Sequence, residues 1–423
     1  MRIIYLHQYF TTPERVGGIR SYEMARRLVA AGHEVHMITS SNAPTDETDW
    51  FETEEAGIHV HWLPVPYSNR QGTLERIRGF LRFAYGSLRK AASLDGDVIF
   101  ATSTPLTIAI PGLYASWRKK IPLVFEVRDL WPEAPVQMGV LTSKPFIAAA
   151  KRLEREAYRR SSHVVALSPG MKAGVVKEGV PSSRVTVIPN ASDLDLFQPG
   201  LDGSEFRKAF GLEDKTVFIY FGTMGPANGL GFVLDSAAEL KRRGRNDIAI
   251  LLHGDGKERD MLEARKRAEG LDNVTFSSWD KHRDDIARLV ASADVAMTIY
   301  KNVPVLYTCS PNKMFDSFSA GKPVLTNMPG WLGGLVEKNR AGVFVEPDST
   351  SDFADKAEYL ADNPELRREF GENARKLAEA DFSRDKLAAK LERILVEAAR
   401  TKAGQPAPVD VPDSLGGVEG QPS

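Results

Sequence analysis

The stretch Thr216-Val217-Phe218-Ile219-Tyr220-Phe221-Gly222-Thr223-Met224-Gly225-Pro226-Ala227-Asn228-Gly229 joins an apolar run to a glycine-rich turn, and a helical pattern follows over Gly231–Arg243. β-branched and aromatic residues in the apolar run predict a buried strand. Glycines between a strand and a helix let the backbone approach a ligand, and the unpaired N–H groups at the helix start favour an anion such as a diphosphate. The alternative for these glycines is a simple flexible turn.

The first half of the chain carries a shorter form of the same arrangement. Gly17-Gly18 lies between the strand pattern Ile3–Leu6 and the helix pattern Ser21–Ala31. Two glycines after a strand also occur in ordinary turns, and the dinucleotide fingerprint Gly-x-Gly-x-x-Gly is absent here. Gly17 and Gly18 are therefore candidate ligand-binding positions without a defined ligand.

Strand and helix patterns alternate through both halves, which predicts an α/β protein with two parallel sheets, each covered by helices on both faces. Such sheets bind ligands at the carboxyl ends of their strands, so we expect a cleft between the two carboxyl edges. The other expected strands are 34–39, 58–64, 97–101, 123–127, 163–167, 185–189, 248–253, 274–276, 294–298, 323–326 and 342–345, and the other expected helices are 73–92, 106–119, 145–160, 257–269, 283–291, 313–320 and 351–362.

These patterns divide the chain into five parts. We expect a first α/β domain at 1–190, a connection at 191–203, a second α/β domain at 204–380, a charged helix at 381–400 that crosses back to the first domain, and a disordered tail at 401–423. The tail is rich in Gly, Pro and Ser and has almost no large apolar residue.

Charge and cysteine content exclude several classes of protein. The net charge of −1 over 423 residues argues against general nucleic-acid binding, but residues 1–190 carry +6 and the remainder −7. A basic half indicates an anionic partner on that side, such as a phosphate or a membrane surface. Cys309 is the one cysteine, so no internal disulfide and no cysteine-based metal site can form. No signal peptide or membrane span is expected.

The stretch from Ser310 to Val324 contains a Lys and an Asp three residues apart. Pro311 fits a helix start, so Lys313 and Asp316 should share one face of the helix. Near a helix N-terminus, the lysine could hold a phosphate and the carboxylate could accept sugar hydroxyls. A surface ion pair between the two side chains is the alternative.

The densest polar cluster of the first half follows the apolar strand 123–127. Arg128, Asp129 and Glu133 would lie at the mouth of the expected cleft, where the arginine could clamp an anion and a carboxylate could act as a base. A structural salt-bridge network is the alternative. The hydroxyls of 102–104, which end another strand, are expected to cap the following helix, with ligand binding as the alternative.

Two further strand ends carry glycines or carboxylates. His253-Gly254-Asp255-Gly256-Lys257 opens a helix pattern, where Asp255 is expected to be a helix cap and Lys257 a possible phosphate contact. Asp193 and Asp195 have the spacing of some metal-binding pairs, but they lie in the connection, so we assign them no metal.

The stretch Tyr67–Ala92 interleaves basic and aromatic residues at helical spacing, with Glu75 as its one acid. This composition is typical of a helix lying on an anionic membrane, and Arg78 and Arg82 would be its main contacts. The alternative is a core-facing helix with a basic outer face.

Taken together in this order, these stretches resemble the retaining glycosyltransferases of family 4, which have the GT-B fold of two Rossmann-like domains. The resemblance extends to about Arg400, and the form Glu126-Val127-Arg128-Asp129-Leu130-Trp131-Pro132-Glu133 is most similar to N-acetyl-fucosamine-type transferases of bacterial surface-polysaccharide assembly, such as O-antigen synthesis. Its other pieces are Gly17-Gly18, 31–35, 187–190, Gly222-Thr223, Gly254-Asp255-Gly256 and 316–324.

The resemblance implies site roles for matching positions. In the family, a Glu-x7-Glu motif contacts the sugar and the ribose of the donor, and here these positions are Thr308 and Asp316. The family also places an Arg and a Lys around the first glycine turn, where this chain has Thr223 and Asn228. Something else must stabilise the charge of the departing diphosphate. By elimination we nominate Lys313, assisted by the 222–229 backbone and Lys257, with Asn312 beside them.

The expected activity is transfer of a sugar, with retention, from a nucleotide sugar such as a UDP-linked N-acetyl-amino sugar to a hydroxyl of a glycan or polyprenyl-diphosphate-linked acceptor. The resemblance implies no metal or other cofactor, and the expected location is the cytoplasm, at the inner membrane face. The alternatives are a GT-B sugar-nucleotide epimerase or hydrolase and a non-catalytic nucleotide-sugar-binding scaffold.

Overall fold

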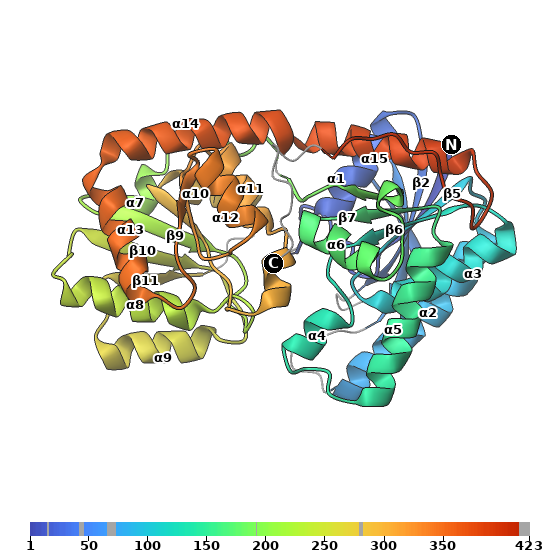
Figure 1. Ribbon diagram of the computed structural model, residues 1–423, viewed down its shortest axis with the longest axis horizontal. Coiled ribbons are helices and arrows are strands. Elements are labelled where there is room, and N and C mark those ends of the chain that lie inside the picture. Colours follow the sequence, from blue (N-terminus) through green and yellow to red (C-terminus); the bar gives the residue numbers. More distant parts are fainter. Residues whose placement is uncertain (15–16, 42–45, 66–72, 192, 279–281, 414–423) are drawn as a thin grey trace. The chain divides into compact units, whose positions relative to one another are not determined.

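The structure is a computed structural model that describes residues 1–14, 17–41, 46–65, 73–191, 193–278 and 282–413. Contacts divide it into two compact units. Among the described residues, the N-terminal unit comprises Met1–Pro189, Thr308–Ser310 and 385–413, and the C-terminal unit comprises Asn190–Tyr307 and Pro311–Arg384. Each unit is an α/β sandwich in its own right (Figure 1). The predicted fold class is confirmed.

The sheet of the N-terminal unit has the strand order β3-β4-β2-β1-β5-β6-β7-β8. Its strands pair in parallel except for β3 with β4, which are antiparallel. The sequence pattern missed β3 because this edge strand, Phe-Glu-Thr-Glu-Glu, carries charged and mostly exposed side chains. The strands are β1 (Arg2–Leu6), β2 (Glu34–Ser41), β3 (Phe51–Glu55), β4 (Ile58–Pro64), β5 (Val98–Thr102), β6 (Leu123–Val127), β7 (His163–Ala166) and β8 (Val185–Val187).

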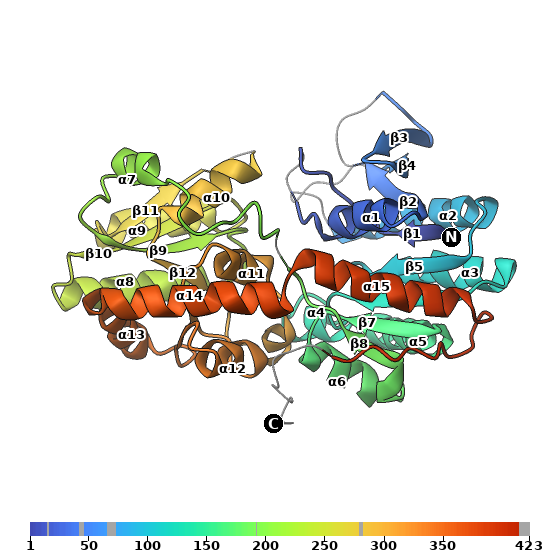
Figure 2. The ribbon, with the colours of Figure 1, turned by 90° about the horizontal axis from the view of Figure 1, so that it is seen from above.

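Helices cover both faces of this sheet. α2, α3 and α5 lie on one face, and α1 and α15 lie together on the other (Figures 1 and 2). The helices are α1 (Arg20–Ala30), α2 (Thr73–Ser93), α3 (Ala109–Lys119), α4 (Glu133–Gln137), α5 (Lys144–Arg160), α6 (Pro169–Lys177) and α15 (Arg384–Ala399), with short 3-10 helices at Leu106–Ile108 and Ser182–Arg184. The pattern missed α6, because Pro169 and Gly170 at its start are typical turn residues.

Two polar contacts hold α15 on α1 and its neighbouring loop. Arg27 Nε donates to Asp385 Oδ1 at 2.5 Å, and His33 Nε2 lies 3.0 Å from Glu392 Oε1. The chain beyond α15 was expected to be disordered from residue 401, which is wrong for 401–413. There the Ala407 N–H donates to the Ser162 carbonyl at 3.0 Å. Backbone hydrogen bonds of this kind order a segment that has few apolar side chains. The expected disorder of 414–423 lies outside the described residues.

The sheet of the C-terminal unit has the order β11-β10-β9-β12-β13-β14, and all of its described pairings are parallel. Its strands are β9 (Thr216–Phe221), β10 (Ile248–His253), β11 (Val274–Ser277), β12 (Val295–Thr298), β13 (Val324–Thr326) and β14 (Gly342–Phe344). Every strand expected in this half is present, because a strand buried on both faces is a continuous apolar run in the sequence.

Eight helices are assigned to the described C-terminal unit, with α8 and α9 below the sheet in Figure 1 and α14 above it. They are α7 (Ser204–Phe210), α8 (Leu230–Arg242), α9 (Arg259–Glu269), α10 (Arg283–Ala291), α11 (Asn312–Ser319), α12 (Trp331–Lys338), α13 (Thr350–Asp362) and α14 (Pro364–Asp381), and a short 3-10 helix spans Pro304–Thr308. The sequence pattern missed α7, α12 and α14. Gly333-Gly334 interrupts the pattern of α12, and one residue separates α14 from α13.

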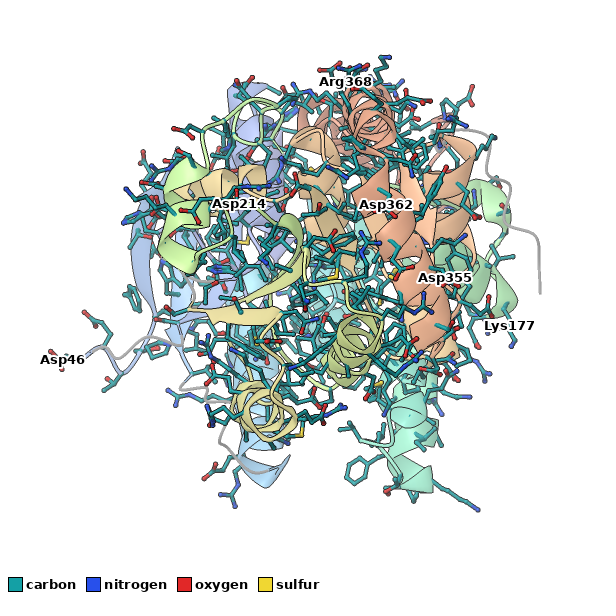
Figure 3. All side chains as sticks on the ribbon, turned by 90° about the vertical axis from the view of Figure 1, so that its left-hand side faces the viewer. Asp46, Lys177, Asp214, Asp355, Asp362 and Arg368 are labelled. Carbon is teal, nitrogen blue, oxygen red and sulfur yellow. The ribbon has the colours of Figure 1, made fainter. Side chains whose placement is uncertain are left out.

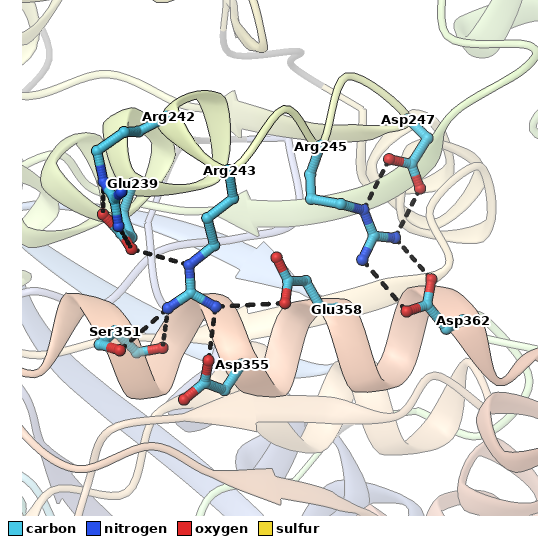
Figure 4. A network of polar contacts seen from close by, with 9 residues as sticks. All are labelled: Glu239, Arg242, Arg243, Arg245, Asp247, Ser351, Asp355, Glu358 and Asp362. Carbon is cyan, nitrogen blue, oxygen red and sulfur yellow. Dashed lines mark hydrogen bonds and ion pairs between the residues drawn. The ribbon is translucent and has the colours of Figure 1, made fainter.

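An arginine network fastens α8 to α13 (Figure 4). Arg243 donates to Glu239, Asp355 and Ser351 with N···O distances of 2.8, 2.5 and 3.0 Å, and Arg245 bridges Asp247 and Asp362. Figure 3 shows Asp355 and Asp362 on α13 and Arg368 of α14 at the upper edge of the view. Several pairs that share one arginine stabilise more than isolated surface pairs do.

Candidate functional site

The carboxyl edge of the C-terminal sheet is built from backbone that only glycine permits. Gly222 follows β9 with φ of +139°, and Gly254 follows β10 with φ of +140°. A Cβ on Gly254 would lie 2.0 Å from the Gly222 carbonyl oxygen, so no side chain fits there. The two strand ends therefore meet directly, and the predicted glycine turn lies at this edge.

The rest of the turn leads into the N-terminus of α8. Tyr220 Oη donates to the Thr223 carbonyl at 2.7 Å, and the Asn228 N–H donates to the Gly225 carbonyl at 2.9 Å. Gly229, at φ of +58°, is the last residue before α8. These contacts fix the turn as the entry to a helix, the position where backbone N–H groups bind anions.

Lys313 brings an unpaired cation to this turn. It lies in the first turn of α11, and its Nζ is buried 3.7 Å from the ring centroid of Tyr220. Within the described residues this Nζ has no hydrogen-bond partner, so the alternative of an ion pair with Asp316 is wrong. A Cβ on Gly222 would lie 3.2 Å from Nζ, which places the amine against the turn backbone. Burial lowers the pKa of Lys313 to about 7.

The other predicted residues of this unit occupy different environments. Asp316 is buried on α11, with 8% of its surface exposed, and Asn312 is the first residue of that helix. Lys257 is exposed and precedes α9 by two residues. The expectation that Asp255 caps this helix is wrong: its carboxylate accepts from the Gly256 N–H at 2.7 Å, and no side chain caps α9.

The carboxyl edge of the N-terminal sheet is centred on a buried ion pair. Glu126, in β6, has no exposed surface and accepts from Arg20 Nη2 at 2.8 Å. Thr102 Oγ1 donates to the other carboxylate oxygen at 2.6 Å. Burial alone would raise the pKa of Glu126, but the Arg20 charge and hydrogen bonds outweigh it and lower that pKa. Arg20 also donates to the carbonyls of Ile188 and Pro189, so this pair ties α1, β6 and the chain after β8 together.

Arg128 and Asp129 lie immediately beyond this pair. The Arg128 N–H donates to Ser103 Oγ at 3.0 Å, and its guanidinium lies 3.1 Å from His7 Nε2. Thr104 Oγ1 donates to Asp129 Oδ2 at 3.0 Å. The expectation that these hydroxyls cap the following helix is wrong, since no side chain caps it.

Desolvation shifts two groups at this edge. Burial raises the pKa of the Asp129 carboxyl, although Thr104 and Arg128 oppose the shift. Burial and the Arg128 charge hold the pKa of His7 well below its usual range. His7 is therefore neutral at pH 7, and its Nε2 can accept a hydrogen bond from the Arg128 guanidinium.

The glycine pair of the first half also contacts this group. A Cβ on Gly17 would lie 2.9 Å from the Thr11 side chain, and one on Gly18 would lie 3.8 Å from Arg128 Nη2. Gly18 and Arg128 are therefore neighbours. Glu133 begins α4 and accepts from Gln137 Nε2 at 2.7 Å.

Thr308 packs within the N-terminal unit. Its carbonyl accepts from Ser168 Oγ at 2.5 Å, and its methyl would be 2.8 Å from a Cβ on Gly170. These contacts belong to the α6 start, and the donor contact assigned to Thr308 stays a prediction.

Sequence reasoning missed Tyr220, Arg20 and His7. Tyr220 is one aromatic residue in an apolar strand, so nothing separates it from core residues. Arg20 and Glu126 had a signal: a carboxylate inside an apolar strand requires a buried partner.

The exposed face of α2 carries Arg78 and Arg82, together with Leu81 and Tyr85 at 56% and 59% exposed, and the membrane contact assigned to it stays a prediction. Residues 66–72 of this predicted stretch lie outside the described residues. No helix of the described chain is long and apolar enough to cross a bilayer.

The comparisons with known proteins agree with this arrangement. Residues 17–191 match the glycosyl transferase 4-like domain, and residues 202–377 match the glycosyl transferases group 1 family. The chain is 27% identical to alpha-D-kanosaminyltransferase of Streptomyces kanamyceticus over 62% of this chain and 67% of that protein. It is 25% identical to the putative colanic acid biosynthesis glycosyl transferase WcaI of Escherichia coli over 80% and 87%.

Solved structures of the same fold cover nearly the whole chain. Sucrose-phosphate synthase from Thermosynechococcus elongatus superposes with a TM-score of 0.76 at 18% identity, covering 93% of this chain and 98% of that one. Anabaena HepE in complex with UDP gives 0.69 at 20% identity, covering 94% and 100%. Fold and sequence thus define a glycosyltransferase with the GT-B fold. The chain belongs to family 4 of these enzymes.

Proposed function

We propose that this chain is a retaining hexosyltransferase that moves a sugar from a UDP-linked N-acetyl-amino sugar to a hydroxyl of a glycan or polyprenyl-diphosphate-linked acceptor in surface-polysaccharide assembly, including O-antigen synthesis. The observation that carries the proposal is the buried amine of Lys313, which has no partner within the described residues and lies against Gly222. A buried cation without a counter-ion is costly, and a bound diphosphate would offset that cost.

Donor binding would use the C-terminal unit. The backbone N–H groups of 222–229 and the α8 N-terminus face the diphosphate, Lys313 neutralises its charge, and Asp316 accepts the ribose hydroxyls. The solved HepE complex with UDP supports a UDP-linked donor. The relative named N-acetyl-alpha-D-glucosaminyl L-malate synthase, of Bacillus anthracis, is 21% identical over 90% of this chain and 94% of its own length, and its name supports an N-acetyl-amino sugar.

The reaction would break the bond between the anomeric carbon and the UDP oxygen and form a bond from that carbon to the acceptor oxygen. The acceptor proton passes to the leaving phosphate, so no metal ion or other cofactor is required. Lys313 stabilises the charge that develops on the diphosphate, which is electrostatic catalysis by a preorganised group. Removal of divalent ions with EDTA should leave the rate unchanged.

Acceptor binding would use the N-terminal unit. Arg128 is held by His7 and Ser103, which makes it a fixed anion clamp for a phosphorylated acceptor. Asp129 and Glu133 would bind acceptor hydroxyls. The name of WcaI, which refers to colanic acid biosynthesis, supports a polysaccharide pathway.

A lipid-linked acceptor requires access to a membrane, and α2 supplies a surface for it. Arg78 and Arg82 are exposed beside Leu81 and Tyr85, a combination of charge and apolar area that binds anionic lipid surfaces. We assign the protein to the cytoplasm, peripheral on the inner face of the membrane. The variant Arg78→Glu/Arg82→Glu should no longer bind anionic vesicles, and binding at the wild-type level would refute this contact.

Incubation with radiolabelled UDP-sugars and a membrane lipid extract tests the proposed reaction. Label that moves into lipid supports transfer. A chemically changed but free sugar nucleotide would instead support an epimerase or hydrolase, and tight UDP binding without turnover would support a binding scaffold.

A further inference from the structure

A second basic site lies at the amino edge of the N-terminal sheet. A hollow of about 660 Å³ opens there, beside Arg2 at the start of β1, Gly96 before β5 and Ile121 before β6. Strands of five residues span about 16 Å, so this hollow is on the opposite edge of the sheet from Arg128 and Asp129. It therefore belongs to neither of the two edges described above.

The lining of the hollow is strongly cationic. Four basic side chains come from three elements, with Asp95 as the one acid: these are Arg2 of β1, Arg89 of α2, and Arg118 and Lys119 of α3. Basic residues are common in the last turn of a helix, where they offset the helix dipole. Arg118 and Lys119 both lie in the last turn of α3, and the Lys119 Nζ also donates to the Ala92 carbonyl at the end of α2 at 3.2 Å.

The charges of the three arginines are less fully neutralised by neighbouring groups. Arg2 pairs with Asp95 at 3.3 Å, but that carboxylate is 79% exposed, so the pair is weak and screened. Arg89 lies over the ring of Tyr85, with 4.6 Å between its Cζ and the ring centroid. Arg118 is exposed. The hollow thus retains positive charge that an anion could neutralise.

Two exposed aromatic side chains contact residues that line the hollow: Tyr85 lies under Arg89, and Trp117 lies 6.0 Å from Tyr114 between ring centroids. Trp117 precedes Arg118 and is 68% exposed, and Tyr85, one helical turn from Arg89, is 59% exposed. Further along the same face of α2 lies Leu81, at 56%. Large aromatic rings at the edge of a basic pocket are typical of protein that sits in the interfacial layer of a membrane, where a ring contacts acyl chains and its polar edge stays wet.

We propose that this hollow binds the phosphate headgroup of an anionic membrane lipid, while Trp117 and Tyr85 enter the interfacial layer. The proposal rests on the membrane contact of α2 given above and adds to it a defined headgroup pocket. Arg89 and Arg118 hold the phosphate from two sides, and the hollow would fix the sheet's amino edge to the membrane.

Flotation with vesicles of phosphatidylcholine, with and without phosphatidylglycerol, tests the pocket. The variant Arg89→Glu/Arg118→Glu should bind phosphatidylglycerol vesicles at least about 30-fold more weakly, since each basic residue near an anionic surface strengthens binding roughly fivefold. The matched control is Arg267→Glu/Arg368→Glu, the same change of charge on residues about 70% exposed in the C-terminal unit, and it should bind like the wild type. Equal binding by both variants would overturn the proposal.

A second measurement locates the contact. Brominated phosphatidylglycerol should quench tryptophan fluorescence in the wild type, and Trp117→Phe should remove most of that quenching. Unchanged quenching would overturn the proposal. A second result would also overturn it: the wild type binds inorganic phosphate saturably but does not bind vesicles, and the Arg89→Glu/Arg118→Glu variant does not bind the phosphate. The pocket would then bind a soluble phosphorylated ligand.

An assay of radiolabelled sugar transfer in detergent-solubilised lipid extract tests the proposed activity independently of the headgroup pocket. The Arg89→Glu/Arg118→Glu variant should transfer at the wild-type rate in detergent, where no bilayer is needed. Loss of transfer in the wild type would count against the glycosyltransferase assignment, while the vesicle result would still decide the pocket.

Discussion

The carboxyl edges of the two sheets differ in how their charges are satisfied. At the N-terminal edge, Glu126 is paired with Arg20 and Asp129 accepts from Thr104. At the C-terminal edge, the Nζ of Lys313 lies on the Tyr220 ring with no hydrogen-bond partner within the described residues. A satisfied network holds its own shape before any ligand arrives, whereas an unpaired buried cation gains a counter-ion only from a ligand.

This difference indicates a division of labour. The N-terminal edge is a preformed framework whose residues position one another, and the C-terminal edge stores the positive charge that a diphosphate requires. Substitutions at the two edges should therefore have different effects. At the N-terminal edge they should reduce stability, and at the C-terminal edge they should reduce donor binding and turnover.

The largest effect is expected from breaking the buried pair. Arg20→Met leaves Glu126 charged without its main partner, which should cost about 3–5 kcal/mol in the free energy of unfolding. Urea denaturation measures it. The double variant Arg20→Met/Glu126→Leu is the control, and it should recover much of the loss because no charge remains buried alone. A cost below about 1 kcal/mol for Arg20→Met would show that the pair does not stabilise this edge.

Removal of the unpaired amine should affect turnover instead. Lys313→Met should lower the rate of sugar transfer by about 100- to 1000-fold, the usual cost of losing one group that stabilises developing negative charge. Lys313→Ala should likewise reduce turnover far more than Asp129→Asn reduces UDP binding. Steady-state rates and calorimetry measure these changes.

A nearby exposed cation offers the matched control for this prediction. Lys257→Met removes the same charge from the same edge but from an exposed position, so its rate should stay within about threefold of the wild type. If Lys257→Met lost as much turnover as Lys313→Met, the burial of Lys313 would have no special role.

Donor affinity should depend on pH through the same amine. Burial lowers the pKa of Lys313 to about 7, and only the protonated form attracts a diphosphate. Below that pH the amine is already charged, so affinity is maximal there, and above it affinity for UDP should fall by up to about tenfold per pH unit as the free amine loses its proton. Calorimetric titration between about pH 7 and 9 measures this, and Lys313→Met should give a nearly flat profile. A flat profile in the wild type would contradict the assignment.

The smallest effect is expected at the arginine network on α8 and α13, which lies outside both edges. Arg243→Ala removes contacts to Glu239, Asp355 and Ser351, and should lower the melting temperature by about 2–4 °C while leaving UDP affinity unchanged. Differential scanning fluorimetry measures it. Arg368→Ala, which loses one exposed pair with Glu365, should melt like the wild type. A change in UDP affinity in Arg243→Ala would contradict the expectation that this network affects stability alone.

The sequence predicted the strands of the C-terminal unit best because each is an apolar run bounded by turn residues, as in Ile248–His253. Prediction failed where the local pattern was polar or contained breakers. The charged edge strand Phe51–Glu55 and the helix at Pro169–Lys177 are both examples. In both cases pairing or packing with distant residues outweighs local propensity.

Within the site, the sequence predicted where the candidate side chains lie better than it predicted which residues they contact. Lys313, Arg128 and Asp129 lie at strand ends or a helix start, as expected. The contacts of these side chains could not be predicted from the sequence. Tyr220 is 93 residues away from Lys313 in the sequence, and only the fold brings its ring beneath the amine. The hydroxyls of 102–104 were assigned to helix capping for the same reason, since their carboxylate partners lie on the neighbouring strand β6 and the loop after it.

A crystal structure with UDP bound would show whether Lys313 binds the diphosphate. Lys313 Nζ should move from the Tyr220 ring to a phosphate oxygen, at about 2.7–2.9 Å, with the backbone of 222–229 around the same group. A diphosphate held by Lys257 or by other cations, with Lys313 Nζ still on the Tyr220 ring, would contradict it.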